Sequence, residues 1–132
     1  NMNRMKNLGM GLDLLLSSSE LSPRQEGEEQ ALRNAESLFK KALNEDEDGQ
    51  LFEAYYYYRQ VIDCLEPFLS LQQEAAKDLL SQACNNAAVI LFENGDLKDA
   101  QAFLEKGLQA NPRNQVAREN LQAMDSDFKD NG

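Results

Sequence analysis

The sequence contains no histidine and no tryptophan, only two cysteines and three prolines, and few basic residues. Without an imidazole, Ser–His triads, histidine proton shuttles and histidine-ligated metal sites are excluded. Thirteen Lys and Arg against 23 Asp and Glu give a formal charge of −10 over 132 residues. Such a balance repels phosphate backbones, so we expect no nucleic-acid partner. At 42% hydrophobic residues the chain is nevertheless typical of one globular domain.

Long apolar runs are also missing. The longest, residues 87–92, is far shorter than the roughly 20 residues that a membrane-spanning helix needs. Residues 4–16 resemble a signal peptide only faintly, because Asp13 interrupts the leucines and no small-residue cleavage pattern follows. We therefore expect no membrane span, no targeting segment and a cytoplasmic protein.

No pattern of reactive or metal-binding residues emerges. Cys64 and Cys84 lie in apolar helical patterns, without a CxxC spacing, and we expect buried free thiols and no zinc site. The acidic run 45–48 lacks the ligand order of a calcium loop and is interpreted as a solvated turn. Gly9 and Gly11 form a GxG with no preceding strand. We expect no catalytic residues, no metal and no cofactor, and hence a protein that is not an enzyme.

Apolar residues recur every three or four positions through most of the chain, and nowhere alternate as in a strand. This pattern predicts an all-α protein in which Pro67 and the Asn-Gly-Asp sequence at 94–96 end helices. The expected helices are residues 5–16, 31–43, 50–66, 71–93, 97–110 and 114–124. We divide the chain into an N-terminal amphipathic helix and polar loop (1–26), a helical domain (27–124) and an acidic flexible tail (125–132).

Residues 81–114 contain a helix, a tight glycine turn, a helix and Asn-Pro within 34 positions, which is the period of a tetratricopeptide repeat, TPR. Residues at seven signature positions resemble the TPR consensus, whereas Cys84 and Ala87 depart from it. Residues 35–61 resemble a preceding repeat with an acidic insertion, and residues 114–124 resemble the first helix of a third. The resemblance implies antiparallel hairpins stacked as a short superhelix of about 2.5 repeats, with an extra N-terminal helix. The seven matching residues are Ala88, Leu91, Gly95, Ala100, Leu104, Gly107 and Pro112.

The pattern is closest to the TPR domains of co-chaperones and large immunophilins. Such arrays bind a peptide or helix in a groove lined by the first helix of each repeat. Asn86 matches the asparagine of their carboxylate clamp, but Val116 and Asn120 stand where the third repeat should be basic, and Leu32 and Glu36 where the first should be. A chaperone C-terminal peptide is therefore the less favoured ligand. The residues expected to face a protein partner are Arg33, Glu36, Lys40, Asn86, Val89 and Asn120.

Two features stay open in the sequence. The four tyrosines at 55–58 cannot all face one core, because they spread around the helix; Tyr58 belongs to the packed stripe, and Tyr56 or Tyr57 should be exposed. The N-terminal helix needs a surface to cover its Met and Leu stripe. It could pack on the first repeat, occupy the groove, or join two copies of the chain. The second hypothesis is accordingly a structural or assembly domain that self-associates or packs within a larger complex.

Overall fold

The computed structural model describes residues 21–68 and 73–131, and side chains up to residue 126. These residues are helical apart from short turns, and no strand occurs among them. The prediction of an all-α protein is confirmed. The helices are α1 (Pro23–Glu47), α2 (Leu51–Leu65), the short 3-10 helix η2 (Glu66–Phe68), α3 (Glu74–Glu93), α4 (Leu97–Ala110) and α5 (Gln115–Asn131). The predicted helix at 5–16 lies outside the described residues.

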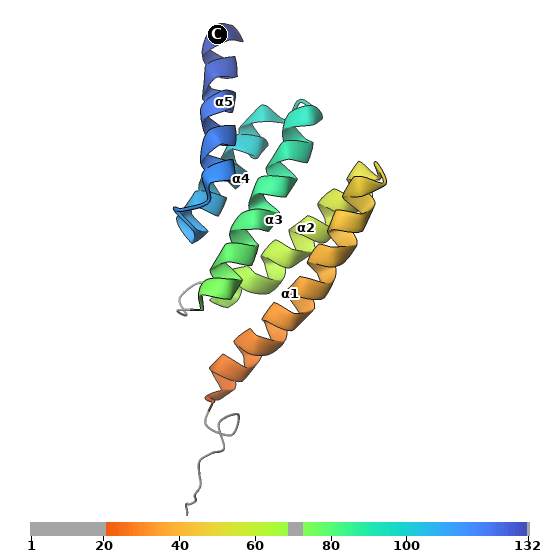
Figure 1. The fold of residues 1–132 in the computed structure, drawn as a ribbon, viewed down its shortest axis with the longest axis vertical. Helices are drawn as coiled ribbons and strands as arrows, with labels where there is room; N and C mark the ends of the chain where they lie inside the picture. The colour runs from red at the N-terminus through yellow and green to blue at the C-terminus, as the bar shows by residue number, and fades with distance from the viewer. Residues whose placement is uncertain (1–20, 69–72, 132) are drawn as a thin grey trace, which may run out of the picture. The chain divides into compact units, whose positions relative to one another are not determined.

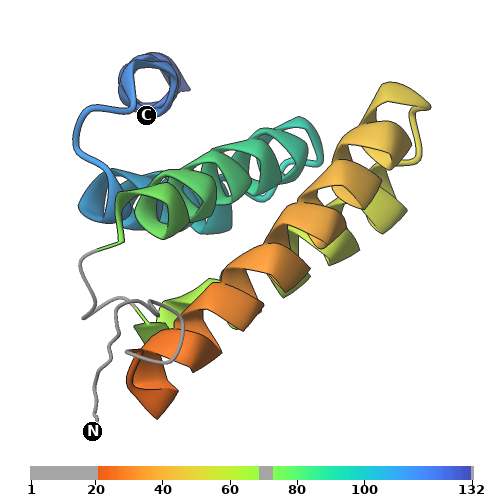
Figure 2. The ribbon, with the colours of Figure 1, turned by 60° about the horizontal axis from the view of Figure 1, so that its bottom comes forward.

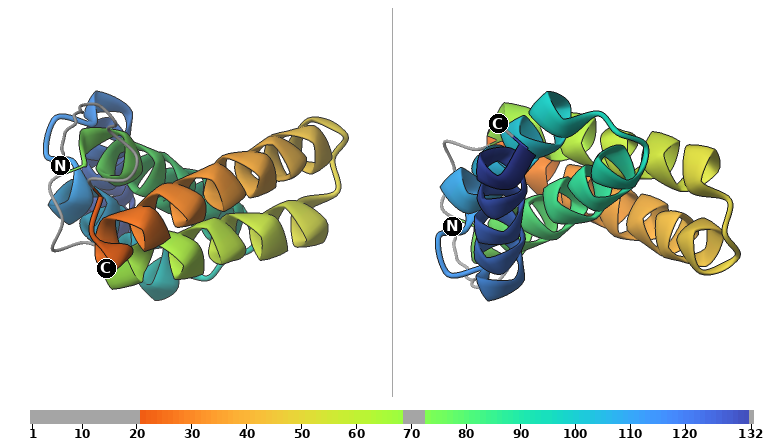
Figure 3. Two further views of the ribbon diagram at one scale, coloured as in Figure 1. Left: turned by 90° about the horizontal axis from the view of Figure 1, so that it is seen from below. Right: turned by 90° about the horizontal axis from the view of Figure 1, so that it is seen from above.

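Adjacent helices pack as antiparallel pairs, α1 with α2 and α3 with α4 (Figure 1). Gly49 and Gly95 make the two tight turns with φ of +78° and +88°, values that only glycine adopts without strain. Figure 2 shows the α1–α2 turn at one end of its pair, and Figure 3 shows α5 beside the α3–α4 pair, which it contacts.

Two predicted boundaries of the first described helix were wrong. Residues 23–26, predicted as loop, are the first turn of α1. Ser22 Oγ accepts a hydrogen bond from the Gln25 amide, and Gln25 Oε1 accepts one from the Ser22 amide. This reciprocal capping box, with Pro23 at the first helical position, starts the helix in a segment that has no apolar stripe. At the other end, residues 45–47 of the acidic run, predicted as a turn, belong to α1, which ends at Glu47.

The last helix is also longer than predicted. It continues through residues 125–131, which the sequence analysis assigns to a flexible tail. Asn114 starts this helix, because its side-chain oxygen accepts a hydrogen bond from the Ala117 amide.

The predicted packing stripes of the central helices are confirmed. On α2 the buried residues are Ala54, Tyr58, Val61, Ile62 and Leu65. The α3 stripe buries Ala76, Leu80, Ala83, Ala87 and Leu91. Tyr56 is exposed, as one member of the tyrosine run had to be.

Close packing at Gly107 and the hydrogen bonds of Ser81 join α3, α4 and the start of α5. A Cβ added at Gly107 would lie 3.2 Å from both the Cys84 Cβ and the Ser81 carbonyl oxygen. Ser81 is fully buried; its hydroxyl donates to the Gly107 carbonyl at 2.7 Å and accepts from Asn114 Nδ2 at 2.8 Å. Small residues and one buried hydroxyl thereby fix the three helices that carry the candidate site.

Candidate functional site

The face between α3 and α5 brings two open hollows together. The first is lined largely by carbon, from Val89, Phe92 and Glu93 of α3, Leu104 of α4, and Asn120, Ala123 and Met124 of α5. It encloses about 190 Å³. We call this hollow and its polar neighbour the α3–α5 groove.

The second hollow is polar and encloses about 420 Å³. Six of its nine lining residues are Asn or Gln, whereas Asp78 and Arg113 are the charged ones. The Arg113 guanidinium lies 3.6 Å from a Glu74 carboxylate oxygen, and both side chains are more than 70% exposed. The other lining residues are Gln82, Asn85, Asn86, Asn111, Asn114, Gln115 and Val116.

A chain of side-chain hydrogen bonds holds the amides of this groove in place. Asn120 Nδ2 donates to Asn85 Oδ1 at 2.8 Å, and Asn85 Nδ2 donates to Asn86 Oδ1 at 3.2 Å. Asn86 Nδ2 donates to the Tyr58 hydroxyl at 3.3 Å, and that hydroxyl donates to Asp46 Oδ2 at 2.8 Å. The chain links α1, α2, α3 and α5, so the orientation of each amide depends on its neighbours.

Tyr58 is the buried anchor of that chain. Its residue is fully buried, and its ring lies 5.8 Å from the Phe39 ring at a tilt of 59°. Burial, and next the hydrogen bond to Asp46, raise the pKa of the Tyr58 phenol well above its ordinary value. The neutral phenol therefore persists at any physiological pH and can donate its proton to Asp46 throughout.

The predicted partner-facing residues divide into two sets. Asn86, Val89 and Asn120 all line the α3–α5 groove. Arg33, Glu36 and Lys40 are exposed on α1 and line neither hollow of the α3–α5 groove. Val116, considered for the clamp, lines the polar hollow and is 58% exposed.

Sequence reasoning missed Asn85 and the polar role of Tyr58. Asn85 is buried and its neighbour Asn86 is half-buried, within the otherwise apolar stretch 83–88. An adjacent pair of amides inside an apolar run is itself a signal, since a buried amide requires hydrogen-bond partners. Their identity depends on which helices pack together.

Both cysteines are free thiols; Cys84 is buried and Cys64 is half-buried. Burial raises the pKa of Cys84 to about 12, and burial also raises the pKa of Cys64. Within residues 21–68 and 73–131, no three carboxylate or thiol side chains gather closely enough to hold a metal ion. No helix in the same ranges is long and apolar enough to cross a membrane.

Comparisons with protein-family models, with curated proteins and with solved structures find no match to this chain. The findings support a domain of five described helices packed as antiparallel pairs, with no family identified.

Proposed function

We propose that this chain is a protein-interaction module of the TPR type that binds a peptide or helical segment of a partner in the α3–α5 groove. The observation that carries the proposal is the adjacency of an apolar hollow and an amide-lined hollow on one face. An apolar hollow suits a partner side chain, and oriented amides suit the backbone groups of a partner segment, which need both donors and acceptors.

The helical pairs favour the TPR type. The 34-residue unit 81–114 covers α3 from Ser81 onward and all of α4, and it ends directly before α5 begins at Gln115; Gly95 makes its turn. Ala88, Ala100 and Gly107 are buried, as expected of small residues that allow close helix approach.

The charges of the groove favour an uncharged ligand over a terminal carboxylate. Arg113 is the one cation among the lining residues of the two hollows, and it lies beside Glu74. Glu93 and Asp78 contribute two carboxylates. An anion there would lose its hydration without enough compensating positive charge.

Affinity capture with the full chain tests the proposal. Val89 is 37% exposed, so Val89→Asp adds a charge in the apolar hollow at little cost to folding. Ala102→Asp adds the same charge at an exposed position of α4 that lines neither hollow. Partners recovered by the wild type and by Ala102→Asp, but lost with Val89→Asp, would support the groove. Equal recovery by all three would refute it.

Self-association is the second candidate, because Val89 and Val116 leave apolar surface exposed in the groove. Light scattering over a range of concentrations tests it. A mass that rises with concentration and falls back with Val89→Asp would assign the groove to a second copy of the chain. A constant monomer mass would reject this candidate.

A further inference from the structure

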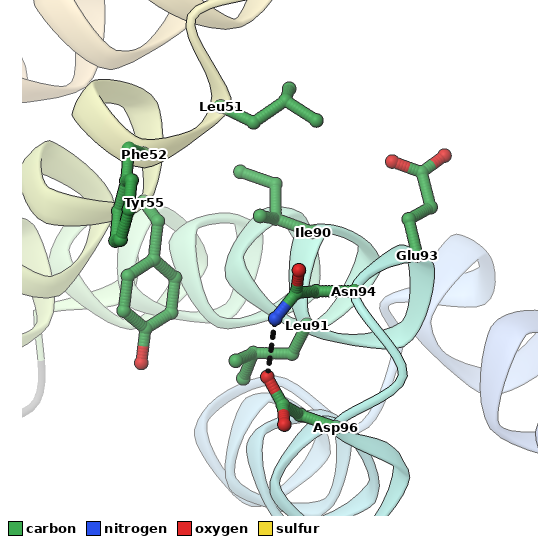
Figure 4. A pocket seen from close by; sticks show the side chains of 8 residues that line it. All are labelled: Leu51, Phe52, Tyr55, Ile90, Leu91, Glu93, Asn94 and Asp96. Carbon is green, nitrogen blue, oxygen red and sulfur yellow. Dashed lines mark hydrogen bonds between the residues drawn. The ribbon is translucent and has the colours of Figure 1, made fainter.

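A third hollow lies between the first turn of α2 and the end of α3, and it meets the α3–α5 groove at Glu93, which lines both. Figure 4 shows its eight lining side chains, which enclose about 310 Å³. We call it the α2–α3 pocket. Leu51, Phe52 and Tyr55 come from α2, Ile90, Leu91 and Glu93 from α3, and Asn94 and Asp96 from the turn to α4.

The turn between α1 and α2 places apolar side chains of α2 at the rim of the α2–α3 pocket. Gly49, at φ +78°, ends the connection from α1, and α2 begins two residues later at Leu51. Leu51 and Tyr55 are four residues apart and so share one face of the helix. Ile90 and Leu91 belong to the two separate core clusters of the domain, and Tyr55 packs against both. The pocket is thus an opening where these clusters meet.

Among the described residues, Phe52 is the most exposed large apolar side chain. It is 87% exposed, and Leu51 beside it is 38% exposed. A lone exposed apolar residue needs no explanation, but a phenylalanine at the rim of an open apolar hollow is typical of an interaction site. Aromatic side chains in such positions are frequent binding hot spots.

The charge around the pocket has one sign. Glu93 and Asp96 are among its lining residues, and no lining residue is basic. Asp96 is the N-cap residue of α4, but its side chain makes no capping hydrogen bond; its carboxylate instead accepts one from Asn94 Nδ2 at 3.0 Å. Exposed acidic residues at 47, 48 and 53 flank Leu51 and Phe52 in the sequence. An apolar hollow with an acidic rim complements a cationic ligand.

We propose that the α2–α3 pocket binds a segment of a partner protein that carries a large apolar anchor with Lys or Arg beside it. The anchor fills the space beside Phe52, Ile90 and Leu91, and the cations face Glu93 and Asp96. Apart from Glu93, this surface shares no lining residue with the α3–α5 groove, so the inference goes beyond the proposed function and does not depend on it.

The test starts with a displayed library of random 12-residue peptides. Peptides that the full chain retains and that Phe52→Ser rejects are synthesised with a fluorescent label, and their binding is measured by anisotropy. Because Phe52 is exposed, its replacement should leave the helical circular dichroism unchanged. Val116→Ser, at a comparably exposed apolar position in the α3–α5 groove, is the matched control.

We expect the retained peptides to combine an apolar anchor with Lys or Arg. Phe52→Ser should weaken their binding about 30-fold or more, as at a hot spot, whereas Val116→Ser should leave it unchanged. Glu93→Gln with Asp96→Asn should weaken binding and reduce its dependence on salt, because surface charge attraction is screened.

Three results would overturn the inference. They are the absence of any peptide that distinguishes wild type from Phe52→Ser, a set of retained peptides that is acidic or neutral, and a concentration-dependent dimer that Phe52→Ser abolishes. The last would assign the pocket to a second copy of the chain.

Discussion

Replacing Tyr58 with phenylalanine isolates the hydroxyl that joins the α1–α2 pair to the groove on α3. The variant keeps the ring beside Phe39 and removes two hydrogen bonds, one to the Asp46 carboxylate at 2.8 Å and one from Asn86 at 3.3 Å. A hydrogen bond to a charged group contributes about 1.5–3 kcal/mol and a neutral one about 0.5–1.5 kcal/mol.

The expected loss is smaller than the sum of these contributions. The phenylalanine no longer buries a hydroxyl, and Asp46 and Asn86 are only half-buried, so water can replace part of what they lose. We expect Tyr58→Phe to lower the free energy of unfolding by about 2 kcal/mol. The melting temperature should fall by about 8 °C in a domain of this size.

Urea and thermal unfolding followed by circular dichroism at 222 nm measure this loss, since the chain has no tryptophan to report by fluorescence. Tyr56→Phe is the matched control; Tyr56 is 63% exposed, and the change should cost less than about 0.5 kcal/mol. If the Asp46 bond accounts for most of the effect, Tyr58→Phe and Asp46→Ala combined should cost less than the sum of the two. Equal costs at Tyr58 and Tyr56, or strict additivity, would refute the reasoning.

Three further predictions concern the packing of α3, α4 and α5. Gly107→Ala should lower the free energy of unfolding by about 1–2 kcal/mol, because the clash with the Cys84 Cβ and the Ser81 carbonyl outweighs the better helix propensity of alanine; an unchanged urea midpoint would contradict this. Asn114→Ala should cost about 1–2 kcal/mol and speed amide hydrogen exchange in the first turn of α5, since both the cap and the bond to Ser81 are lost; exchange as slow as in the wild type would count against that role. The Cys84 thiol, with its pKa raised by burial to about 12, keeps its proton in the folded state where the unfolded chain loses it above about pH 9. The stability that it contributes is complete below pH 9 and falls by at most about 1.4 kcal/mol per pH unit as the pH rises to 12. The free energy of unfolding, measured by urea titration at each pH, should therefore decline less steeply with pH in Cys84→Ala than in the wild type, with Cys64→Ala as control. Parallel curves for Cys84→Ala and the wild type would contradict the assignment.

The sequence was sufficient for the helices that bury an apolar stripe and for the turn at Gly95. It was insufficient at the helix ends. The polar residues 21–26 carry no apolar period, so the start of α1 had to be found in the Ser22–Gln25 capping box. The end of α1 was missed because Asp46 is held by Tyr58, a partner twelve positions away that only the pairing of α1 with α2 supplies.

The candidate site, too, could be predicted from the sequence only in part. The positions of Asn86, Val89 and Asn120 on one face follow from the repeat period, and the structure places all three along one groove. The link from Asn120 through Asn85 to Asn86 spans 35 positions of sequence, and its geometry depends on how closely α5 approaches α3. That approach is set by Ser81, Gly107 and Asn114, whose hydrogen bonds no periodicity reveals.

Photo-crosslinking from the groove tests the central claim most directly. A benzoylphenylalanine is placed at Val89 in one full-length sample and at Ala102 in another, and each is irradiated in an extract of the source cells. The account predicts adducts with partner proteins at Val89 that are absent at Ala102, and mapped to one short segment of each partner. Identical adducts at the two positions, or no adduct except with a second copy of this chain, would contradict it.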